Sequence, residues 1–535
     1  MIIGKEFLDV SRERSRRGTA QTILLCLLVC TSSAFAQEPA ALLEDSIIRV
    51  VEEWESSVVS IARFKPAPFE AVAEEHKNFP LPRGLRESRD VDLRPNDFGA
   101  GCLVSPPDSQ ERLVLTNFHV VRGGPIFPNT KAEDRTELIV SFADRRRCQG
   151  AIIAADPRSD LAVLRLDWGG SNIKPTAYKS LNWEAARPPR KGQFVILLGN
   201  PYAISRDGSA SVSWGMVSNL TRQPISFGRP QFFDSEERAK ISMLYRLGAV
   251  MQLDARMNLG LSGGPVLNLK GELIGISTSL AAIEGYEQSV GFALPFDEQT
   301  RRIVRTLLAG QAVEYGMIGI VPGEISGNEF LSLNTGLSQQ SAAVVDQCTT
   351  GSPAQNAGIK VDDVILAVND QPVLSRTDLF RMVGLNAPGS EIDISIWRRD
   401  ARPPRFDLKV KLGKWPALDD EGIIETNPRH EPWRGISVDY PTAIDRFMDK
   451  PPVDMRRVLV TRVNPESPAA AAQLQVGNTI THVNKTPVHT PAEFHAAVKG
   501  ISGPVTIRVD GDPRSVIPEI RRGRVVIIQD AADNN

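Results

Sequence analysis

Two different spacings of hydrophobic residues divide the first half of the chain. Between residues 41 and 55 (ALLEDSIIRVVEEWE) apolar residues recur at helical spacing, which predicts a helix. Val58–Ala62 then begins a strand. From Phe98 to about Pro295, short apolar runs are separated by Gly, Asn, Asp and Pro, a pattern typical of a β-barrel or sandwich. The clearest runs are 101–104, 112–116, 137–141, 161–164, 194–198 and 273–276.

Two polar segments interrupt the β-type pattern. Residues 64–97 are rich in Pro, Arg and Glu, and residues 222–247 break the rhythm of short strands. Because neither segment offers a regular apolar face, we expect both to be insertions in the β-rich domain.

The C-terminal part contains an internal repeat. Gly351-Ser-Pro-Ala354 precedes an apolar run that ends in Val368-Asn369, and Glu466-Ser-Pro-Ala469 precedes a similar run that ends in Val483-Asn484. Two copies are too few for a solenoid, so the repeat indicates two copies of one small domain, separated by a linker at 415–432. Each copy continues into a helix-like segment and a strand, at 377–383 and 391–397 and again at 491–498 and 504–509.

The first 36 residues have the pattern of an export signal. Arginines near residues 14–17 precede an apolar core at 22–30, and Ala34-Phe-Ala36 forms a small-x-small cleavage site. The apolar run is shorter than the roughly 20 residues that a membrane span needs. An uncleaved anchor is the alternative. We expect cleavage after Ala36 and an exported chain with no later membrane span, located in the periplasm, the cell envelope or the extracellular space.

Composition limits the possible partners and cofactors. The 535 residues suffice for three or four domains at roughly 100–200 residues each. A net charge of -2 provides no general field for nucleic acid. Beyond the signal, Cys102 and Cys148 could pair or remain buried free thiols, and Cys348 completes an odd count. Neither a CxxC motif nor a Cys/His cluster occurs, so we expect no metal and no cofactor.

A serine framed by glycines introduces the candidate chemistry. In the stretch NLGLSGGPVLN, Ser262 is either a turn residue or a nucleophile. A serine nucleophile needs a base, an acid that orients the base, and donors for the developing oxyanion. Flanking glycines allow the backbone N–H groups of Gly260 and Ser262 to point into one site.

One histidine occupies a suitable position for the base. His119 follows a strand of the β-rich domain in TNFHVV. A lone histidine at a strand end is usually structural, and Asp160 in SDLAVL alone is an ordinary strand-edge residue. Their occurrence together with Ser262 favours the catalytic interpretation. The remaining histidines lie in the first insertion, the linker or the second repeat: His76, His430, His482, His489 and His495.

The order His119, Asp160, Ser262, in TNFHVV, SDLAVLRL and GLSGGPVLN, resembles that of the trypsin-like serine proteases, in particular the HtrA/Deg family. The segments LGNP, VSWGMV, QLDA and GELIGIST resemble strands of that family in the same order, and the two repeats resemble PDZ domains. The resemblance covers about residues 41–525. It implies a mainly β protein with a chymotrypsin/trypsin-like double six-stranded β-barrel, followed by two PDZ α+β domains.

The resemblance also implies domain boundaries. The implied units are a signal at 1–36, a trypsin-like protease domain at 37–310, a first PDZ domain at 311–414, a linker at 415–432, a second PDZ domain at 433–527 and a tail at 528–535.

Site roles follow from the same resemblance. Ser262 corresponds to the nucleophile, His119 to the general base, and Asp160 to the carboxylate that holds the imidazole. The N–H groups of Gly260 and Ser262 correspond to the oxyanion hole. In PDZ domains an x-Φ-Gly-Φ loop receives a peptide carboxylate. The matching residues are Met317, Ile318, Gly319 and Ile320 in the first domain, and Trp433, Arg434, Gly435 and Ile436 in the second.

Several residues depart from the family pattern. Leu261 stands where the family usually has Asn or Asp, Leu259 where proline is common, and Phe118 where Asn is common. Leu259 and Leu261 would shape the oxyanion loop. Arg256 disfavours cleavage after Lys or Arg. It either favours acidic side chains or points outward and leaves a shallow pocket for small aliphatic residues. Asp254 matches a structural aspartate of the family.

The resulting expectation is an exported serine endopeptidase that acts on unfolded or damaged envelope proteins. Its PDZ domains would bind peptide C-termini, and the family resemblance implies a homo-oligomer, a trimer or a multiple of it. Nucleic acid is not an expected partner. Two alternatives remain: an inactive PDZ-containing scaffold or chaperone-like protein, supported by Leu259 and Leu261, and an ester hydrolase using the same residues.

Overall fold

The computed structural model describes twelve parts of the chain. The predicted signal and nearly all of both predicted insertions lie outside them, as does Leu259. The described residues are 40–64, 95, 97–127, 136–169, 175–200, 209–222, 250–258, 260–278, 290–415, 422–441, 457–510 and 523–530.

The first barrel consists of six antiparallel strands, five of them at the predicted apolar runs, whereas the strand at 147–156 has no counterpart among those runs. Its strand order is β5-β4-β1-β2-β3-β6, and β5 also pairs with β6, which closes the barrel. Val59, Ile61 and Leu164 belong to its buried interior. The strands are β1 (Val58–Phe64), β2 (Asp97–Val104), β3 (Leu113–Asn117), β4 (Glu137–Phe142), β5 (Arg147–Asp156) and β6 (Leu161–Asp167).

The second barrel is also closed, in the order β10-β11-β12-β9-β8-β7. Leu197, Val217 and Ile274 lie in its interior. The prediction of a double six-stranded β-barrel is therefore confirmed. The strands are β7 (Phe194–Gly199), β8 (Ser211–Arg222), β9 (Val250–Leu253), β10 (Pro265–Leu267), β11 (Leu273–Ser277) and β12 (Gly291–Pro295).

A further apolar cluster joins the two barrels to two helices. The predicted N-terminal helix extends over 40–54 and contributes Val50 to this cluster. The other helix, α5 (Glu298–Leu308), contributes Ile303 and Leu307. At the start of α5, the Asp297 side chain accepts a hydrogen bond from Thr300 N–H, which satisfies an otherwise unpaired donor of the first turn.

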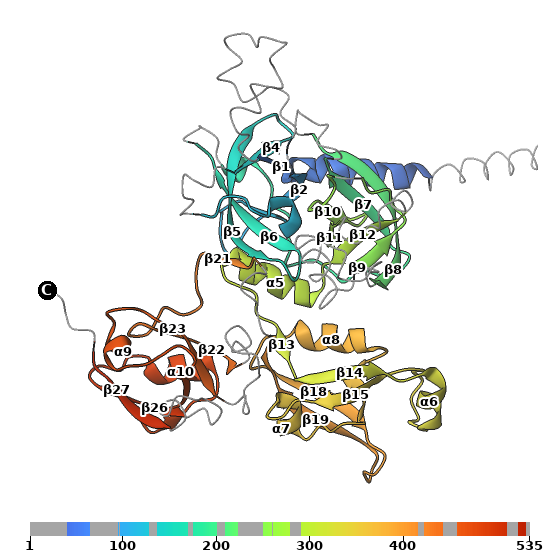
Figure 1. Cartoon of the computed structure of the whole chain (residues 1–535). Helices are drawn as coiled ribbons and strands as arrows, with labels where there is room; N and C mark the ends of the chain where they lie inside the picture. The colour runs from blue at the N-terminus through green and yellow to red at the C-terminus, as the bar shows by residue number, and fades with distance from the viewer. Residues whose placement is uncertain are drawn as a thin grey trace, which may run out of the picture.

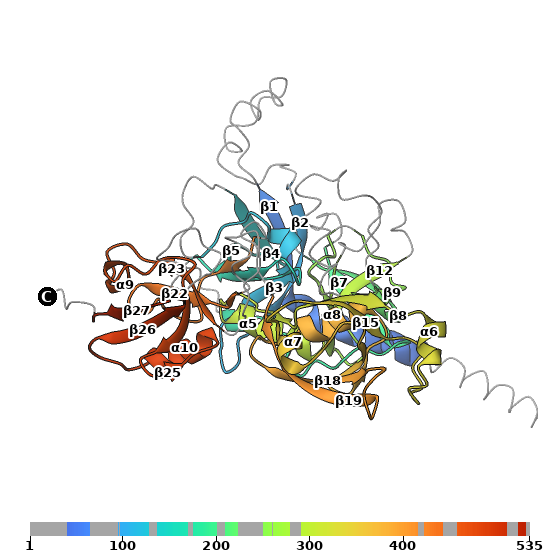
Figure 2. The ribbon, with the colours of Figure 1, turned by 60° about the horizontal axis from the view of Figure 1, so that its bottom comes forward.

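Two PDZ-type domains follow α5, and Figure 1 shows both below the barrels, the first in yellow and orange and the second in red. In Figure 2 the second domain lies to the left of the first, and Lys411 Nζ of the first lies 3.1 Å from Glu493 Oε1 of the second. The predicted strand 391–397 and helix 491–498 are confirmed as β18 and α10. The first domain contains β13 (Gly316–Met317), β14 (Ile320–Glu324), α6 (Gly327–Ser332), β15 (Ala343–Cys348), α7 (Pro353–Ala357), β16 (Val364–Val368), β17 (Gln371–Pro372), α8 (Arg376–Gly384), β18 (Glu391–Trp397), β19 (Arg405–Lys411) and β20 (Gly413–Lys414).

The second PDZ-type domain repeats the sheet order of the first. Its order β22-β23-β24-β26-β27 corresponds to β14-β15-β16-β18-β19, so the sequence repeat is a structural repeat. The elements are β22 (Ile436–Asp439), β23 (Val458–Val463), α9 (Pro468–Ala471), β24 (Thr479–Val483), β25 (Thr486–Pro487), α10 (Pro491–Val498), β26 (Val505–Asp510) and β27 (Arg524–Ile528).

Part of the segment between the PDZ domains belongs to the first barrel's sheet. Ile424–Glu425 forms β21, which pairs with Ala154 and Ala155 of β5. The next residue, Thr426, donates its hydroxyl to Ile153 O at 2.8 Å and its N–H to Gly310 O. The description of 415–432 as a linker misses this strand, which ties the segment to the first barrel.

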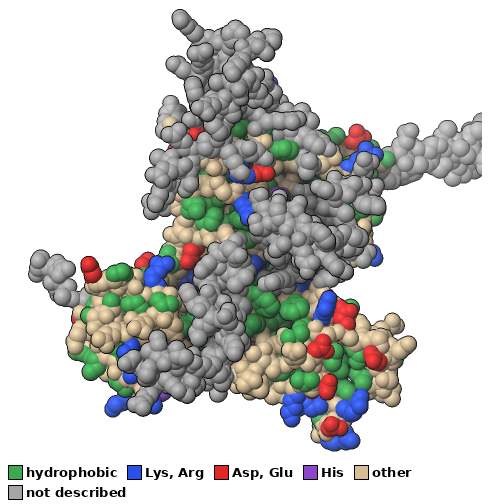
Figure 3. All heavy atoms as spheres, in the orientation of Figure 1, with side chains coloured by type: hydrophobic (Ala, Val, Ile, Leu, Met, Phe, Trp, Pro, Cys, Tyr) green, Lys and Arg blue, Asp and Glu red, His purple; other side chains and the backbone are tan. Residues whose placement is uncertain are grey.

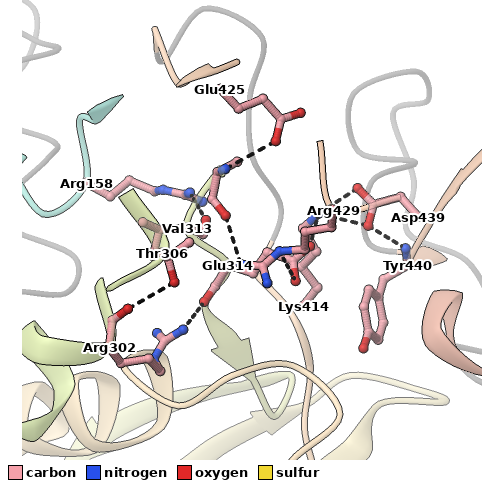
Figure 4. A network of polar contacts seen from close by, with 11 residues as sticks. Arg158, Arg302, Thr306, Val313, Glu314, Lys414, Glu425, Arg429, Asp439 and Tyr440 are labelled. Atoms are coloured by element: carbon pink, nitrogen blue, oxygen red, sulfur yellow. Dashed lines mark hydrogen bonds and ion pairs between the residues drawn. The ribbon is translucent and has the colours of Figure 1, made fainter. Parts of the chain in front are cut away.

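The three domains meet at an ion cluster around Glu314 (Figure 4). Lys414 Nζ lies 3.0 Å from Glu314 Oε1 and 2.7 Å from Asp439 Oδ2, and Arg429 Nε lies 3.5 Å from Glu314 Oε2. Burial alone would raise the pKa of Glu314, but Lys414 and Arg429 outweigh it and hold that pKa below its ordinary value. Burial also opposes charge on Lys414, yet Asp439 and Glu314 raise its pKa.

The cysteines of the described structure are free. Cys102 is buried and Cys148 is half-buried, so the alternative of a disulfide between them is not realised. Burial raises the pKa of both thiols to about 12, with a contribution from Asp167 at Cys148, which makes them poor nucleophiles at neutral pH.

On the face shown in Figure 3, acidic and basic side chains are interspersed over the first PDZ domain.

Removal of the Lys414 charge should open the domain junction. We expect Lys414→Met to destabilise it by about 3 kcal/mol, because two partly buried carboxylates lose their shared cation. The calorimetric unfolding transition of the full chain measures this. Lys409→Met is the matched control, because Lys409 pairs with two carboxylates at 68% exposure, and its substitution should leave the unfolding transition unchanged.

The same variant has a defined pH dependence. The lowered pKa of Glu314 gives stability that is present above its unfolded-state pKa and is lost as the pH falls. The raised pKa of Lys414 gives stability that is lost only as the pH rises through that value. The difference between wild type and Lys414→Met should therefore be largest near neutral pH and shrink on acidification. An equal difference at acidic and neutral pH would contradict the assignment.

Candidate active site

Ser262 lies in a tight loop between β9 and β10 and is 2% exposed. Its carbonyl accepts Ala100 N–H of β2 at 2.7 Å, so the loop of the second barrel is fixed to the first barrel. Ser277 Oγ donates to Leu261 O at 2.6 Å, and Gly263 N–H donates to Ser277 O at 2.9 Å. The serine is therefore held by backbone contacts on both sides.

Backbone conformation and close contacts explain why two positions of the loop are glycine. Gly260 and Gly263 have φ of 98° and 89°, in the left-handed region that L-residues with a Cβ avoid. A Cβ on Gly263 would lie 2.1 Å from Ala100 O and 2.4 Å from Thr116 Oγ1. In the described part of the chain, Gly260 N–H takes part in no hydrogen bond.

His119 lies on α3 (Phe118–Val121), a single helical turn that follows β3 directly. Its ring is 19% exposed, while Phe118, Val120 and Val121 are buried. The buried neighbours anchor the turn and leave the imidazole at the surface of the first barrel.

Asp160 is fully buried and paired with His119. Oδ2 lies 2.9 Å from His119 Nδ1, and Oδ1 accepts His119 N–H at 3.0 Å. Thr278 Oγ1, which follows β11 of the second barrel, donates to Oδ2 at 3.2 Å. Because a carboxylate only accepts, it favours the tautomer with the proton on Nδ1 and leaves Nε2 as the basic nitrogen.

The backbone at Asp160 is also fixed. Its φ is 54°, an uncommon conformation for a non-glycine residue. Its carbonyl accepts Phe118 N–H and Asn117 Nδ2, both at 3.0 Å. Residues 117–119 therefore bind both the main-chain carbonyl and the side-chain carboxylate of Asp160. No role is predicted for Asn117 or Thr278 from the sequence, because no local pattern marks a residue that contacts a distant carboxylate.

The structure places Leu261, Arg256 and Asp254 in three different environments. Leu261 is 3% exposed, and a Cβ on Gly199 would lie 2.8 Å from its Cδ2, so its side chain packs against β7. Arg256 is exposed, in agreement with the outward orientation considered for it. Asp254 Oδ1 accepts Met216 N–H of β8 at 2.5 Å, a structural contact.

The two loops matched to PDZ carboxylate loops share a left-handed glycine and one hydrogen bond, although Arg434 is also left-handed, at φ 48°, and Ile318 is not. Gly319 and Gly435 have φ of 78° and 86°. Ile318 O accepts Ala354 N–H, and Arg434 O accepts Ala469 N–H at the equivalent place of the second domain. Ile320 and Ile436 then begin β14 and β22, which are edge strands of their sheets.

The loops differ in their side chains. Ile318 is buried, and Met317 is half-buried on β13. Arg434 donates to Ile528 O at 2.9 Å and pairs with Asp530, so it is bound to the C-terminal strand of its own domain. Trp433 packs edge-to-face on Phe494 of α10.

The described residues contain no cluster of three or more His, Cys, Asp or Glu side chains able to hold a metal. In the same ranges, no helix combines the length and the apolar character required to cross a membrane.

Comparison with known proteins agrees with this geometry. The chain matches the family model of the trypsin-like peptidase domain over residues 99–276 and that of the PDZ domain over 344–398 and 459–510. These matches identify a trypsin-like serine endopeptidase with two PDZ domains.

Relatives specify the family. Proteins named probable periplasmic serine endoprotease DegP-like match from Pseudomonas fulva, at 30% identity over 74% of this chain and 72% of the relative, and from Ectopseudomonas mendocina, at 29% identity over 88% and 91%. The chain belongs to this family of HtrA/DegP-like serine endoproteases.

Solved structures of similar proteins include the HtrA-type protease AlgW with a tripeptide, at 22% identity, a TM-score of 0.46 and coverage of 70% of this chain and 99% of that one. A serine endoprotease from Yersinia pestis matches at 22% identity with a TM-score of 0.40, over 69% and 97%.

Gly263 should tolerate no side chain. We expect Gly263→Ala to reduce peptidase activity more than about 100-fold, because its Cβ would collide with Ala100 O and displace the serine loop. Casein hydrolysis measures the activity. Gly336→Ala is the control: φ there is also positive, at 72°, but nothing lies within 4 Å of the added Cβ, so only a backbone cost of about 1–2 kcal/mol is expected. Equal activity of the two variants would contradict the loop geometry.

Proposed function

We propose that His119, Asp160 and Ser262 are the catalytic residues of this endopeptidase. The observation that carries the proposal is the contact of His119 Nδ1 with the fully buried Asp160 carboxylate at 2.9 Å. Ser262 lies on a loop that is hydrogen-bonded to β2 of the barrel that carries both other residues.

The chemistry follows from these groups. Ser262 Oγ attacks the scissile carbonyl carbon while His119 Nε2 takes the hydroxyl proton. Asp160 stabilises the imidazolium that forms. The protonated His119 then donates to the leaving amine, and a water repeats the sequence to release the acid. The N–H groups of Gly260 and Ser262 stabilise the oxyanion, and loss of one such donor costs about 2.7–4 kcal/mol in a serine protease.

The location, substrates and assembly belong to the same proposal. Residues 1–36 serve as a signal that is cleaved after Ala36, and the mature chain acts in the periplasm, as the names of the relatives support. Its substrates are unfolded or damaged envelope polypeptides, and it works as a homo-oligomer. The proposed protease domain spans 37–310, and the proposed PDZ domains span 311–414 and 433–527.

The PDZ loops are proposed to bind peptide C-termini. Residues 317–320 and 433–436 turn with glycine in the left-handed region before the edge strands β14 and β22. A peptide added to such an edge gains main-chain hydrogen bonds, and its terminal carboxylate can enter the backbone nest of the loop.

Substitution of the proposed nucleophile or base should abolish cleavage. We expect Ser262→Ala and His119→Ala to lose casein hydrolysis by on the order of 10⁶-fold, to below detection, because neither proton transfer nor acylation remains. His489→Ala, in the exposed turn before α10, is the control and should cleave like wild type. Cleavage that survives in Ser262→Ala would exclude this nucleophile. No cleavage by any form, even with added C-terminal peptides, would favour the inactive scaffold.

Peptide binding should depend on a free carboxylate. We expect a fluorescent peptide with an aliphatic C-terminus to bind at least about tenfold more tightly as the free acid than as the amide, because only the acid forms charge-assisted bonds to backbone N–H groups. Fluorescence anisotropy measures this. Gly319→Ala and Gly435→Ala should each weaken binding to their own domain, since the added Cβ would lie 2.5 Å and 2.2 Å from the Cβ of Ser352 and Ser467. Equal binding of acid and amide would argue against terminus recognition.

A further inference from the structure

A second buried carboxylate lies in the turn that carries Asp160. Asp156 is the last residue of β5, and its side chain is fully buried. Oδ1 accepts Arg158 Nε at 3.0 Å, and Oδ2 accepts Ser159 N–H at 3.0 Å. Oδ2 also accepts the hydroxyl of Tyr315. The charge of Asp156 is therefore balanced by a buried guanidinium and by two further donors.

These contacts determine the shape of the turn between β5 and β6. Asp160 N–H donates to Pro157 O at 3.2 Å, and Asp160 occupies the left-handed region. A non-glycine residue remains in that conformation only where surrounding contacts require it. The direction of the Asp160 carboxylate toward His119 thus depends on the contacts of Asp156 in the same turn.

Arg158, which fixes the turn through Asp156, also contacts the residues that follow α5. Arg158 Nη2 donates to Val313 O at 2.6 Å (Figure 4). Its guanidinium also lies 4.6 Å from the ring centroid of Tyr315, which is fully buried. Val313 and Tyr315 immediately precede β13.

The segment between the PDZ domains approaches the same turn from another direction. A Cβ on Gly422 would lie 3.4 Å from Phe118 Cζ and 4.0 Å from Pro157 Cγ. Two residues later, Ile424 pairs with Ala155 of β5. This segment therefore contacts both the residue before His119 and the turn before Asp160.

We infer that Asp156, Arg158 and Tyr315 are positioning residues for Asp160, and that the segment joining the protease to its first PDZ domain is part of the support of the active site. The inference rests on the proposed catalytic role of Asp160. It assigns no contact with substrate to these residues. A displacement of Val313 or Tyr315 would reach the catalytic carboxylate through Arg158 and Asp156.

The hydroxyl of Tyr315 is protonated at neutral pH and can donate. Burial raises its pKa well above the ordinary value, and the charge of Asp156 raises it further. Ionisation of the tyrosine therefore does not compete with its hydrogen bond to Asp156.

Tyr315→Phe tests the inference with least disturbance, because the buried ring remains and only the hydroxyl is lost. We expect kcat for a chromogenic peptide to fall about tenfold with KM nearly unchanged. The rate of Ser262 labelling by a fluorophosphonate should fall in parallel. The acidic limb of the kcat/KM profile should move to lower pH, because a displaced Asp160 stabilises imidazolium less.

Arg158→Met should change kcat and the pH profile in the same direction and more strongly. Arg158→Lys should recover little activity, since a lysine ammonium cannot bond Asp156 and Val313 together as the forked guanidinium does.

Tyr178→Phe is the matched control. The Tyr178 ring is also buried, and its hydroxyl donates to Asp144 Oδ2 at 2.8 Å, so the substitution again removes only a hydroxyl but leaves the contacts of the turn intact. It should lower the unfolding temperature without moving the pH profile. Tyr315→Phe with wild-type kcat and pH profile would overturn the inference, as would equal pH profiles for Tyr315→Phe and Tyr178→Phe. Wild type is first compared with Ser262→Ala: absence of Ser262-dependent labelling in wild type would instead refute the proposed catalytic role, and the positioning inference with it.

Discussion

A carboxylate removed from water must find donors or a cation, and this chain buries two within one five-residue turn. Asp160 takes its donors from His119 of the first barrel and Thr278 of the second. Asp156 takes its donors from Arg158 and from Tyr315, at the start of the first PDZ domain. The turn is thus the point at which both barrels and the domain junction meet, and each must be in place for both charges to be satisfied.

The parts that the sequence predicts are those with local signals. β18 and α10 coincide with their predicted bounds, because alternating or helical apolar spacing and a Thr490-Pro491 helix start are visible within a few residues. His119, Asp160 and Ser262 could be proposed for a related reason. Each lies in a short stretch whose neighbouring residues indicate its role, such as the glycines around Ser262.

The parts that the sequence misses depend on distant partners. β21 has only two residues, and its pairing with β5 is decided by tertiary packing and by Thr426, not by its own apolar pattern. Tyr315 reads as an ordinary core aromatic until its hydroxyl is seen to reach Asp156. Leu261 stands out in sequence as a departure, yet its buried side chain against Gly199 shows that packing of the loop accounts for it.

The segment 313–315 has different partners at successive residues. The Val313 and Tyr315 side chains lie in the core that joins the barrels, whereas Glu314 between them is held by Lys414 and Arg429. A three-residue stretch fixed on both sides cannot shift toward the PDZ domains without changing the contacts of Val313 O and the Tyr315 hydroxyl. The ion pairs of Glu314 and the position of the Asp160 carboxylate therefore both depend on the backbone of residues 313–315. This backbone connects the first PDZ domain to the turn that carries the Asp160 carboxylate.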